Sequence, residues 1–152
     1  MEFRRAGNTI EVEGAAFGYR DFEEGVINVL VDEDFAYELK DEGWNVKFPE
    51  KQEGDRYERQ PYLPVAVRFG KIKDLWPEIL VKKTRKSHAV QYDAEMVGNL
   101  TKASFESVNL VIRPRRWRDD FGETRIKAFL KSMYAILEGD SFRDAFLNYE
   151  ED

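Results

Sequence analysis

The strongest constraint on the fold is a pair of strand-like segments close to each other near the end of the chain. "SFESVNLVIRP", residues 104–114, and "TRIKAFLKSMYAIL", Thr124–Leu137, both have the apolar pattern of β-strands. Between them, "DDFGE" contains Asp119, Asp120 and Gly122, residue types that favour a tight turn. We therefore expect an antiparallel hairpin, and with it a fold built mainly from β-strands.

The rest of the chain predicts further short strands. "NTIEVEG" alternates apolar and acidic residues, and "GVINVLV", Gly25–Val31, has the composition of a buried strand. "WNVKF", "PYLPVAVRFG" and "PEILVKKT" supply three more strands. Pro64 lies inside the second of these, which predicts that this strand begins at a sheet edge.

Two segments change to a helical pattern. After Asp32 or Asp34, either of which can cap a helix, Phe35 and Leu39 form an apolar stripe that ends at Gly43. "DAEMVGNL", Asp93–Leu100, predicts a second short helix. The segment Glu50–Gln60 is polar and mixed in charge, and we expect an exposed loop there.

About seven short strands and two short helices predict a mainly β protein with small helical insertions. An OB-type Greek-key barrel fits the chain length and the helix interruption. A β-sandwich is the alternative, because spacing does not give the strand order. We expect one OB-like β-barrel domain over residues 1–137 and an acidic C-terminal tail over residues 138–152.

Charge is unevenly distributed along the 152 residues, whose net charge is -6. Residues 1–64 hold eight basic and sixteen acidic residues, which gives -8. Residues 65–131 hold fifteen basic and eight acidic residues (+7), and residues 132–152 hold one basic and six acidic residues (-5). Such polarity suggests a basic binding region and an acidic tail, although charges also cluster by chance on solvated faces.

The basic region culminates in the predicted hairpin. In strict alternation, the last strand presents a core face made of Ile126, Ala128, Leu130, Ser132, Tyr134 and Ile136, and an outer face made of Arg125, Lys127, Phe129, Lys131 and Met133. The preceding strand leads into "RPRRWRDDFG". Together they predict a two-stranded ribbon that interleaves cations with aromatic rings.

This combination favours binding of single-stranded nucleic acid. Basic side chains neutralise phosphates, and exposed rings stack on unpaired bases. The candidate nucleic-acid-binding residues are Arg113, Arg115, Arg116, Trp117, Arg118, Arg125, Lys127, Phe129 and Lys131. The alternative is a solvated hairpin whose Trp117 and Phe129 pack inward, with the arginines in plain cation–π contacts.

Several segments together resemble a known family. "DEGWNVKFPE", "PYLPVAVRF", "FESVNLVIRPRRW" and "GETRIKAFLKSMYAIL" are similar, in this order and spacing, to small phage-encoded single-stranded-DNA-binding proteins. The resemblance covers most of Phe17 to Leu137, and its most specific part is "VNLVIRPRRW" followed by "IKAFLKSMY". It implies an OB-fold and a role in phage DNA replication or recombination. "RPRRWR" is more basic than is usual for that group, which implies stronger phosphate binding or a changed partner.

Other functions have weaker support in the sequence. The chain has no cysteine and one histidine, His88, which argues against a nucleophile triad or a zinc site. Asp119, Asp120 and Glu123 could hold a metal ion for a nuclease, but they belong to one predicted turn. An acidic interaction protein, either a DNA mimic or a host-factor inhibitor that uses the N-terminal acids, is the main alternative.

We accordingly expect a non-enzymatic protein that needs no cofactor or metal. Single-stranded DNA is the expected partner, with replication or recombination proteins as further partners of the acidic tail. A homodimer is left open. No apolar run is long enough to span a bilayer or to form a signal peptide, so we expect a cytoplasmic protein, in the host cell if the chain is phage-encoded.

Overall fold

The computed structural model describes residues 1–50, 53–54 and 60–138. Nine strands and one α-helix make the chain mainly β, as predicted. The strands are β1 (Glu2–Ala6), β2 (Thr9–Glu13), β3 (Phe17–Asp21), β4 (Val26–Leu30), β5 (Tyr62–Ala66), β6 (Glu78–Lys82), β7 (Val90–Tyr92), β8 (Phe105–Arg118) and β9 (Thr124–Leu137). The helical elements are α1 (Glu33–Glu42) and the 3₁₀ turns η1 (Lys73–Leu75) and η2 (Val97–Leu100).

The strands form one sheet in the order β1-β2-β8-β9-β5-β4-β3, with β6 also paired to β9 and β7 paired to β6. Across the described part of the chain this sheet is strongly bent but does not close into a full barrel. The arrangement is consistent with an OB-like β fold that carries a small helical insertion. No helix in these ranges is both long enough and apolar enough to cross a membrane.

Strand β9 pairs with three other strands of the sheet. Along its whole length it pairs antiparallel with β8. On its other edge it pairs in parallel first with β5, at Ala128 and Phe129, and then with β6, from Ser132 to Ile136. β5 lies between β4 and β9 in the sheet, and its first residue, Tyr62, already pairs with Leu30 on one side and with Lys47 on the other. The edge predicted from Pro64 is therefore not found, and Pro64 lies opposite Asn28 of β4, just before the two residues that pair with β9.

The change of partner coincides with a β-bulge. Val111 pairs with Ser132, whereas the next residue, Ile112, pairs with Leu130. Lys131 is therefore an extra residue on β9 that has no directly opposite residue on β8. A bulge of this kind reverses which face the following side chains occupy.

Strict alternation is therefore wrong for the second half of β9. Ile126, Ala128 and Leu130 are buried as predicted, but beyond the bulge Met133 and Ala135 are the buried residues. Ser132, Tyr134 and Ile136, predicted to face the core, are only partly buried. Nothing in the composition of "FLKSMY" indicates where the extra residue falls.

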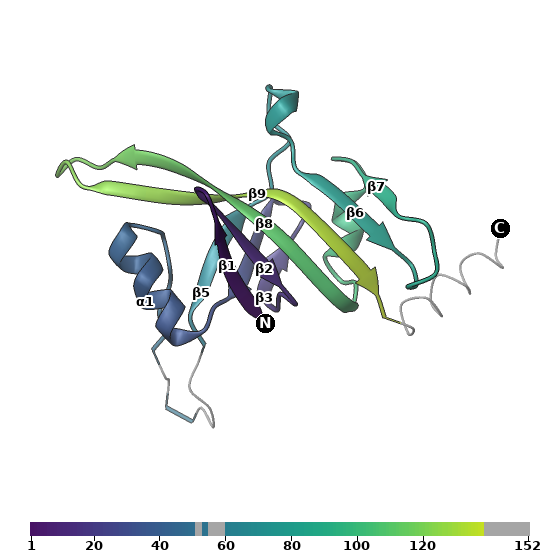
Figure 1. Ribbon diagram of the computed structural model, residues 1–152, viewed down its shortest axis with the longest axis horizontal. Coiled ribbons are helices and arrows are strands. Elements are labelled where there is room, and N and C mark those ends of the chain that lie inside the picture. Colours follow the sequence, from purple (N-terminus) through teal and green to yellow (C-terminus); the bar gives the residue numbers. More distant parts are fainter. Residues whose placement is uncertain (51–52, 55–59, 139–152) are drawn as a thin grey trace.

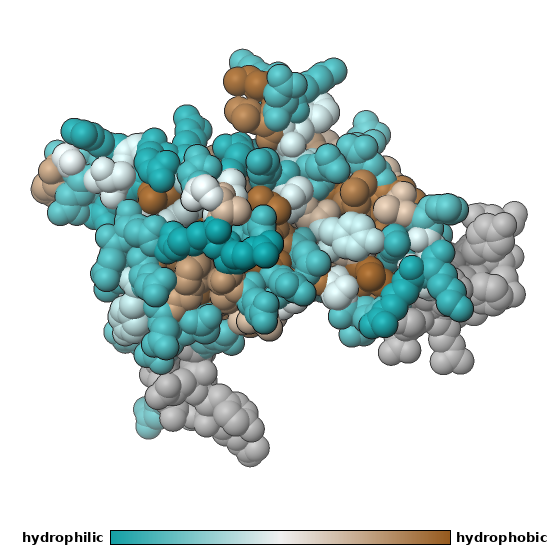
Figure 2. All heavy atoms as spheres, in the orientation of Figure 1, coloured by the Kyte–Doolittle hydropathy of each residue, from teal (hydrophilic) through white to brown (hydrophobic). Residues whose placement is uncertain are grey.

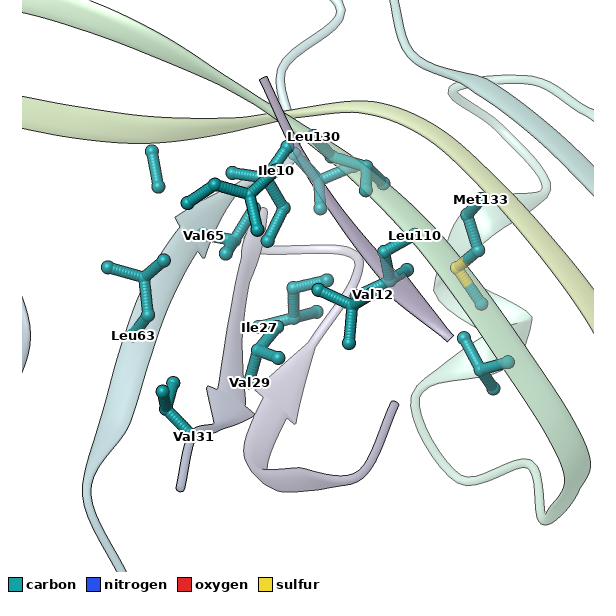
Figure 3. Close-up of a cluster of buried hydrophobic side chains, with 14 of the residues drawn as sticks. Ile10, Val12, Ile27, Val29, Val31, Leu63, Val65, Leu110, Leu130 and Met133 are labelled. Atoms are coloured by element: carbon teal, nitrogen blue, oxygen red, sulfur yellow. The ribbon is translucent and has the colours of Figure 1, made fainter. Parts of the chain in front are cut away.

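The core lies inside the bend of the sheet. Buried side chains from β2, β4, β5, β8 and β9 meet there (Figure 3), and they include Ile10, Val12, Ile27, Val29, Leu63, Val65, Leu110, Leu130 and Met133. All are aliphatic or Met, and within the described residues no polar or charged side chain is buried. The alternation predicted for "NTIEVEG" and the buried character of "GVINVLV" are both confirmed.

Helix α1 is attached to β9 by its C-terminal end. The Asp32 side chain caps the first turn by accepting from the Phe35 N–H, and Gly43 ends the helix in the left-handed region at φ 104°. The Gly43 carbonyl then accepts from the Ile126 N–H at 2.8 Å, and the Asn45 N–H donates to the Ile126 carbonyl at 3.2 Å. The helix was predicted to end at Gly43 and to be capped by Asp32 or Asp34, and the structure selects Asp32. Its attachment to β9 was not predicted.

Several local predictions were incomplete. "WNVKF" forms only isolated bridges, Trp44 with Ile126 and Lys47 with Tyr62, instead of a strand. "DAEMVGNL" forms a turn capped by Asp93 followed by η2, which is shorter than the predicted helix. Strands β1, β3 and β7 were missed because their polar or glycine-containing sequences lack a clear period. Most of the predicted loop Glu50–Gln60 lies outside the described residues.

Gly43→Ala should destabilise the protein for two reasons. An L-residue is strained at this φ by about 1–2 kcal/mol, and its Cβ would lie 2.6 Å from the Thr124 carbonyl oxygen. Thermal unfolding should therefore show a Tm lower by at least about 2–4 °C. Gly7→Ala is the matched control, because Gly7 has φ 63° but open space around the added Cβ. Equal losses in the two variants would contradict the close approach of α1 to β9.

Candidate nucleic-acid interface

The paired ends of β8 and β9 leave the body of the protein as a two-stranded arm. Figure 1 shows this arm reaching past α1 at the left of the view. Pairing continues to its last residues, Trp117 with Arg125 and Arg118 with Thr124. We call residues 113–131 the ribbon.

Asp119 organises the turn at the tip of the ribbon. Its side chain accepts from the N–H groups of Phe121 and Glu123 and pairs with the Arg125 guanidinium, at 2.9 Å between Oδ2 and Nε. Partial desolvation works to raise the pKa of Asp119, but the hydrogen bonds from Arg125 and the backbone outweigh it and hold the pKa below its ordinary value. Gly122 supplies the positive φ of 77° that the turn requires.

The cross-strand register divides the predicted binding residues between two faces. Directly opposite residues share a face of an antiparallel pair. One face, called the ribbon face below, carries the three pairs Arg113–Phe129, Arg115–Lys127 and Trp117–Arg125. The opposite face carries Arg116 and Arg118, opposite Ile126 and Thr124, and Lys131 is the exposed extra residue of the bulge. Six of the nine predicted residues are thus brought together.

Positive charge on the ribbon face is only partly neutralised. Arg115 lies directly opposite Lys127, a pairing of like charges that destabilises a sheet. Arg125 forms ion pairs with Asp119 and Glu123 at the turn. Within the described part of the chain, no ion pair involves Arg113, Arg115 or Lys127. This face therefore favours an anion.

Phe129 lies beneath its charged neighbours. It is 8% exposed, with the Arg113 guanidinium 4.6 Å and the Lys127 ammonium 5.4 Å from its ring centroid. Desolvation, followed by the charge of Arg115, lowers the pKa of Arg113. Its Nε is buried without a hydrogen-bond partner among the described residues. The ring thus supports two cations in this structure and offers no free face to a base, as the inward-packing alternative describes for this residue.

Trp117 remains open to solvent, with 52% of its surface exposed. Phe121, at the tip of the turn, is 91% exposed. Sequence reasoning treated Phe121 only as part of the turn, although an aromatic residue between Asp and Gly at the end of a basic hairpin was the available signal. The ribbon therefore carries two accessible rings, at Trp117 and at the tip.

A groove of about 600 Å³ lies beside the ribbon, between it, the end of α1 and β5. Trp117, Arg125 and Lys127 line one side, and Lys40 and Arg68 line the other. Among the described residues that line the groove, Asp119 is the only acid. Lys40 and Arg68 were missed because they come from an acidic helix and an isolated position, so only the fold brings them to the ribbon.

The metal-dependent nuclease and the histidine-based active site considered from the sequence can be compared with this geometry. Asp119 spends its carboxylate on the turn, as expected of a turn residue, and among the described residues no group of three or more His, Asp or Glu could hold a metal ion. His88 is an exposed side chain in the loop before β7.

Similarity to known proteins is found in the fold and in the family of the sequence. No curated protein sequence matches this chain. Two solved structures, "Single-stranded DNA-binding protein from bacteriophage Enc34, C-terminal truncation" and the same protein "in complex with ssDNA", superpose with a TM-score of 0.53 at 14% identity, covering 86% of this chain and 87% of theirs. The untruncated Enc34 protein has a TM-score of 0.52 at 13% identity and 91% coverage of both chains. These structural similarities concern the fold.

Sequence similarity extends over nearly the whole chain. The family described as "Putative phage ssDNA-binding domain" matches residues 6–150. That range includes the ribbon, the groove beside it and the body of the sheet. The chain belongs to this phage single-stranded-DNA-binding family.

Proposed function

We propose that this protein binds single-stranded DNA along the ribbon, without strong sequence preference. The observation that carries the proposal is the ribbon face, where unneutralised Arg115 and Lys127 adjoin the exposed ring of Trp117. Family membership supports it, and one solved structure of the Enc34 protein, which has a similar fold, is a complex with ssDNA.

The geometry assigns different tasks to different side chains. Arg115, Lys127 and Arg125 would neutralise phosphates on the ribbon face, and Lys40 and Arg68 would do so across the groove. Arg113 would act as a cation held over the Phe129 ring. Arg116, Arg118 and Lys131 would extend the positive field to the other face and the bulge. Trp117 would stack on a base, and Phe121 would provide a second ring.

Stacking on Trp117 favours a single strand over a duplex. Bases in a duplex are already stacked on each other, and exposing one ring face requires unstacking. An unpaired strand presents its bases without the free-energy cost of unstacking. Every base has a π-face, so stacking requires no particular sequence. The contacts to phosphates are equally indifferent to sequence.

The biological role that we propose is the coating of exposed strands during phage DNA replication or recombination. The chemistry of coating requires no catalytic group and no cofactor. The acidic tail over residues 138–152, of which only Glu138 is described, is proposed to contact replication or recombination proteins. Coating would take place in the cytoplasm of the host cell.

Replacement of ribbon-face cations should reduce the salt dependence of binding. Fluorescence anisotropy of labelled oligo-dT at several salt concentrations should give a slope of roughly -0.7 per phosphate contacted. Arg115→Ala and Lys127→Ala should each bring the slope closer to zero by about 0.7. Lys102→Ala, at an exposed cation outside the ribbon, is the control and should leave the slope unchanged. Weakened binding with an unaltered slope in Arg115→Ala would contradict the phosphate contact.

Trp117→Ala should act on affinity and leave salt dependence alone. Loss of one stacked base should weaken oligo-dT binding by roughly 1–3 kcal/mol, about 5- to 150-fold in Kd, because the ring carries no charge. Tyr19→Ala, at a 60% exposed ring on β3, serves as the control. A duplex of equal length should bind the unmodified protein weakly and respond little to Trp117→Ala. Equal affinity for duplex and single strand would sink the stacking assignment.

A further inference from the structure

A short turn between β5 and β6 carries apolar side chains into solvent. η1 protrudes from the sheet at the top of Figure 1, and Figure 2 shows apolar residues gathered on it. Ile72 is 62% exposed, Leu75 48% and Trp76 38%. We call residues 70–76 the knob. Contiguous exposed apolar surface commonly marks an interaction site.

The knob is held in a fixed shape. The Leu75 N–H donates to the Ile72 carbonyl at 3.1 Å, and the Trp76 N–H donates to the Lys73 carbonyl at 3.0 Å. The indole N–H of Trp76 donates to the Gly70 carbonyl at 2.6 Å, and its ring packs edge-on against Phe69. A preformed apolar tip loses little conformational freedom on docking.

A second surface of interest is a hollow of about 630 Å³ over β8 and β9, between the β1–β2 hairpin and β6. Its apolar lining includes the half-buried Leu80 and Val111. Four glutamates and one arginine also line it, which leaves a formal charge of -3: Glu2, Glu11, Glu13, Glu78 and Arg4. Arg4 pairs with Glu11, whereas in the described ranges no ion pair involves Glu13 or Glu78.

The knob and the hollow are complementary in both polarity and charge. The knob offers apolar Ile72 and Leu75 flanked by Lys71 and Lys73, with one acid, Asp74, so its formal charge is +1. The hollow offers an apolar lining with an acidic rim. The knob of one copy stands away from the sheet and does not fill its own hollow. An acidic rim also repels DNA, which excludes nucleic acid as the natural occupant.

We propose that the knob of one copy of this protein docks in the hollow of a second copy. Neither surface includes a ribbon residue, so the contact leaves the proposed DNA-binding ribbon free. Because knob and hollow are different surfaces, the contact is exchanged reciprocally in a two-fold pair or repeated from copy to copy along a strand. The inference goes beyond the proposed function and does not depend on it.

Sedimentation velocity over a range of protein concentrations, without DNA, tests this contact. The unmodified protein should show a mass that rises above the 17.9 kDa of one chain. Ile72→Asp/Leu75→Asp in the knob and Glu13→Lys/Glu78→Lys in the hollow should each raise the concentration for half-association by about tenfold or more. Val90→Asp, a 46% exposed residue on β7 outside both surfaces, is the control and should associate normally.

A charge exchange identifies the two surfaces as partners. Lys71→Glu/Lys73→Glu should associate poorly alone, and it should associate again when mixed with Glu13→Lys/Glu78→Lys. A protein that remains monomeric at every concentration, or association that ignores either pair of substitutions, would overturn the proposal. Circular dichroism melts confirm that each variant folds, and anisotropy with an oligo-dT too short for two copies reports ribbon binding separately.

Discussion

The long antiparallel pairing of β8 with β9 is the interaction on which the rest of the structure depends. Within the residues that the structure describes, it is the only strand pairing that runs from the core to the tip of the ribbon. On the other edge of β9, β5 occupies two residues and β6 the last stretch, which leaves the ribbon end without a strand neighbour. The bulge at Lys131 lets one strand serve both regions, because it turns Met133 into the core while Lys127 still faces solvent. The attachment of α1 at Ile126 then fixes the angle at which the ribbon leaves the body.

Like charges lie close together on the ribbon face and repel each other, and a bound phosphate chain would reduce this repulsion. Arg115 opposite Lys127 weakens the cross-strand pair, and Arg113 is partly desolvated over Phe129. Asp119 offsets this at the tip by binding two backbone N–H groups and Arg125. Arg113 and Lys127 are held over Phe129, and Arg125 is held by Asp119, before any ligand arrives. If DNA binds here as we propose, binding would relieve repulsion and would cost little side-chain entropy at these three residues.

The sequence predicted the features of this structure that depend on residues adjacent in the chain, and it did not predict those that depend on which strands become neighbours. The α1 caps at Asp32 and Gly43, the hairpin and the buried strands were all predicted, since each depends on residues adjacent in the chain. The bulge at Lys131 was not, because the register is decided by the change of neighbour from β5 to β6. In the candidate site, alternation along the last strand gave Arg125 and Lys127, and the predicted hairpin added Arg115 and Trp117 to the ribbon. It could not reveal that Arg113 would cover Phe129, or that Lys40 and Arg68 would approach from other elements.

The acidic N-terminal half gains a physical meaning from the position of the ribbon. Acids on β1, β2 and β6 gather around the hollow, which β9 lines with Ser132, Met133 and Tyr134, whereas β9 lines the groove with residues 125–128, nearer the tip of the ribbon. Other acids of the N-terminal half lie on α1, whose C-terminal end lines the groove. A polyanion would be repelled at the hollow and, on the binding mode that we propose, attracted at the ribbon face. The net charge of -6 therefore does not oppose the binding of DNA. On the two proposals made above, it would confine DNA binding to the ribbon and leave the acidic hollow to a partner with basic and apolar side chains.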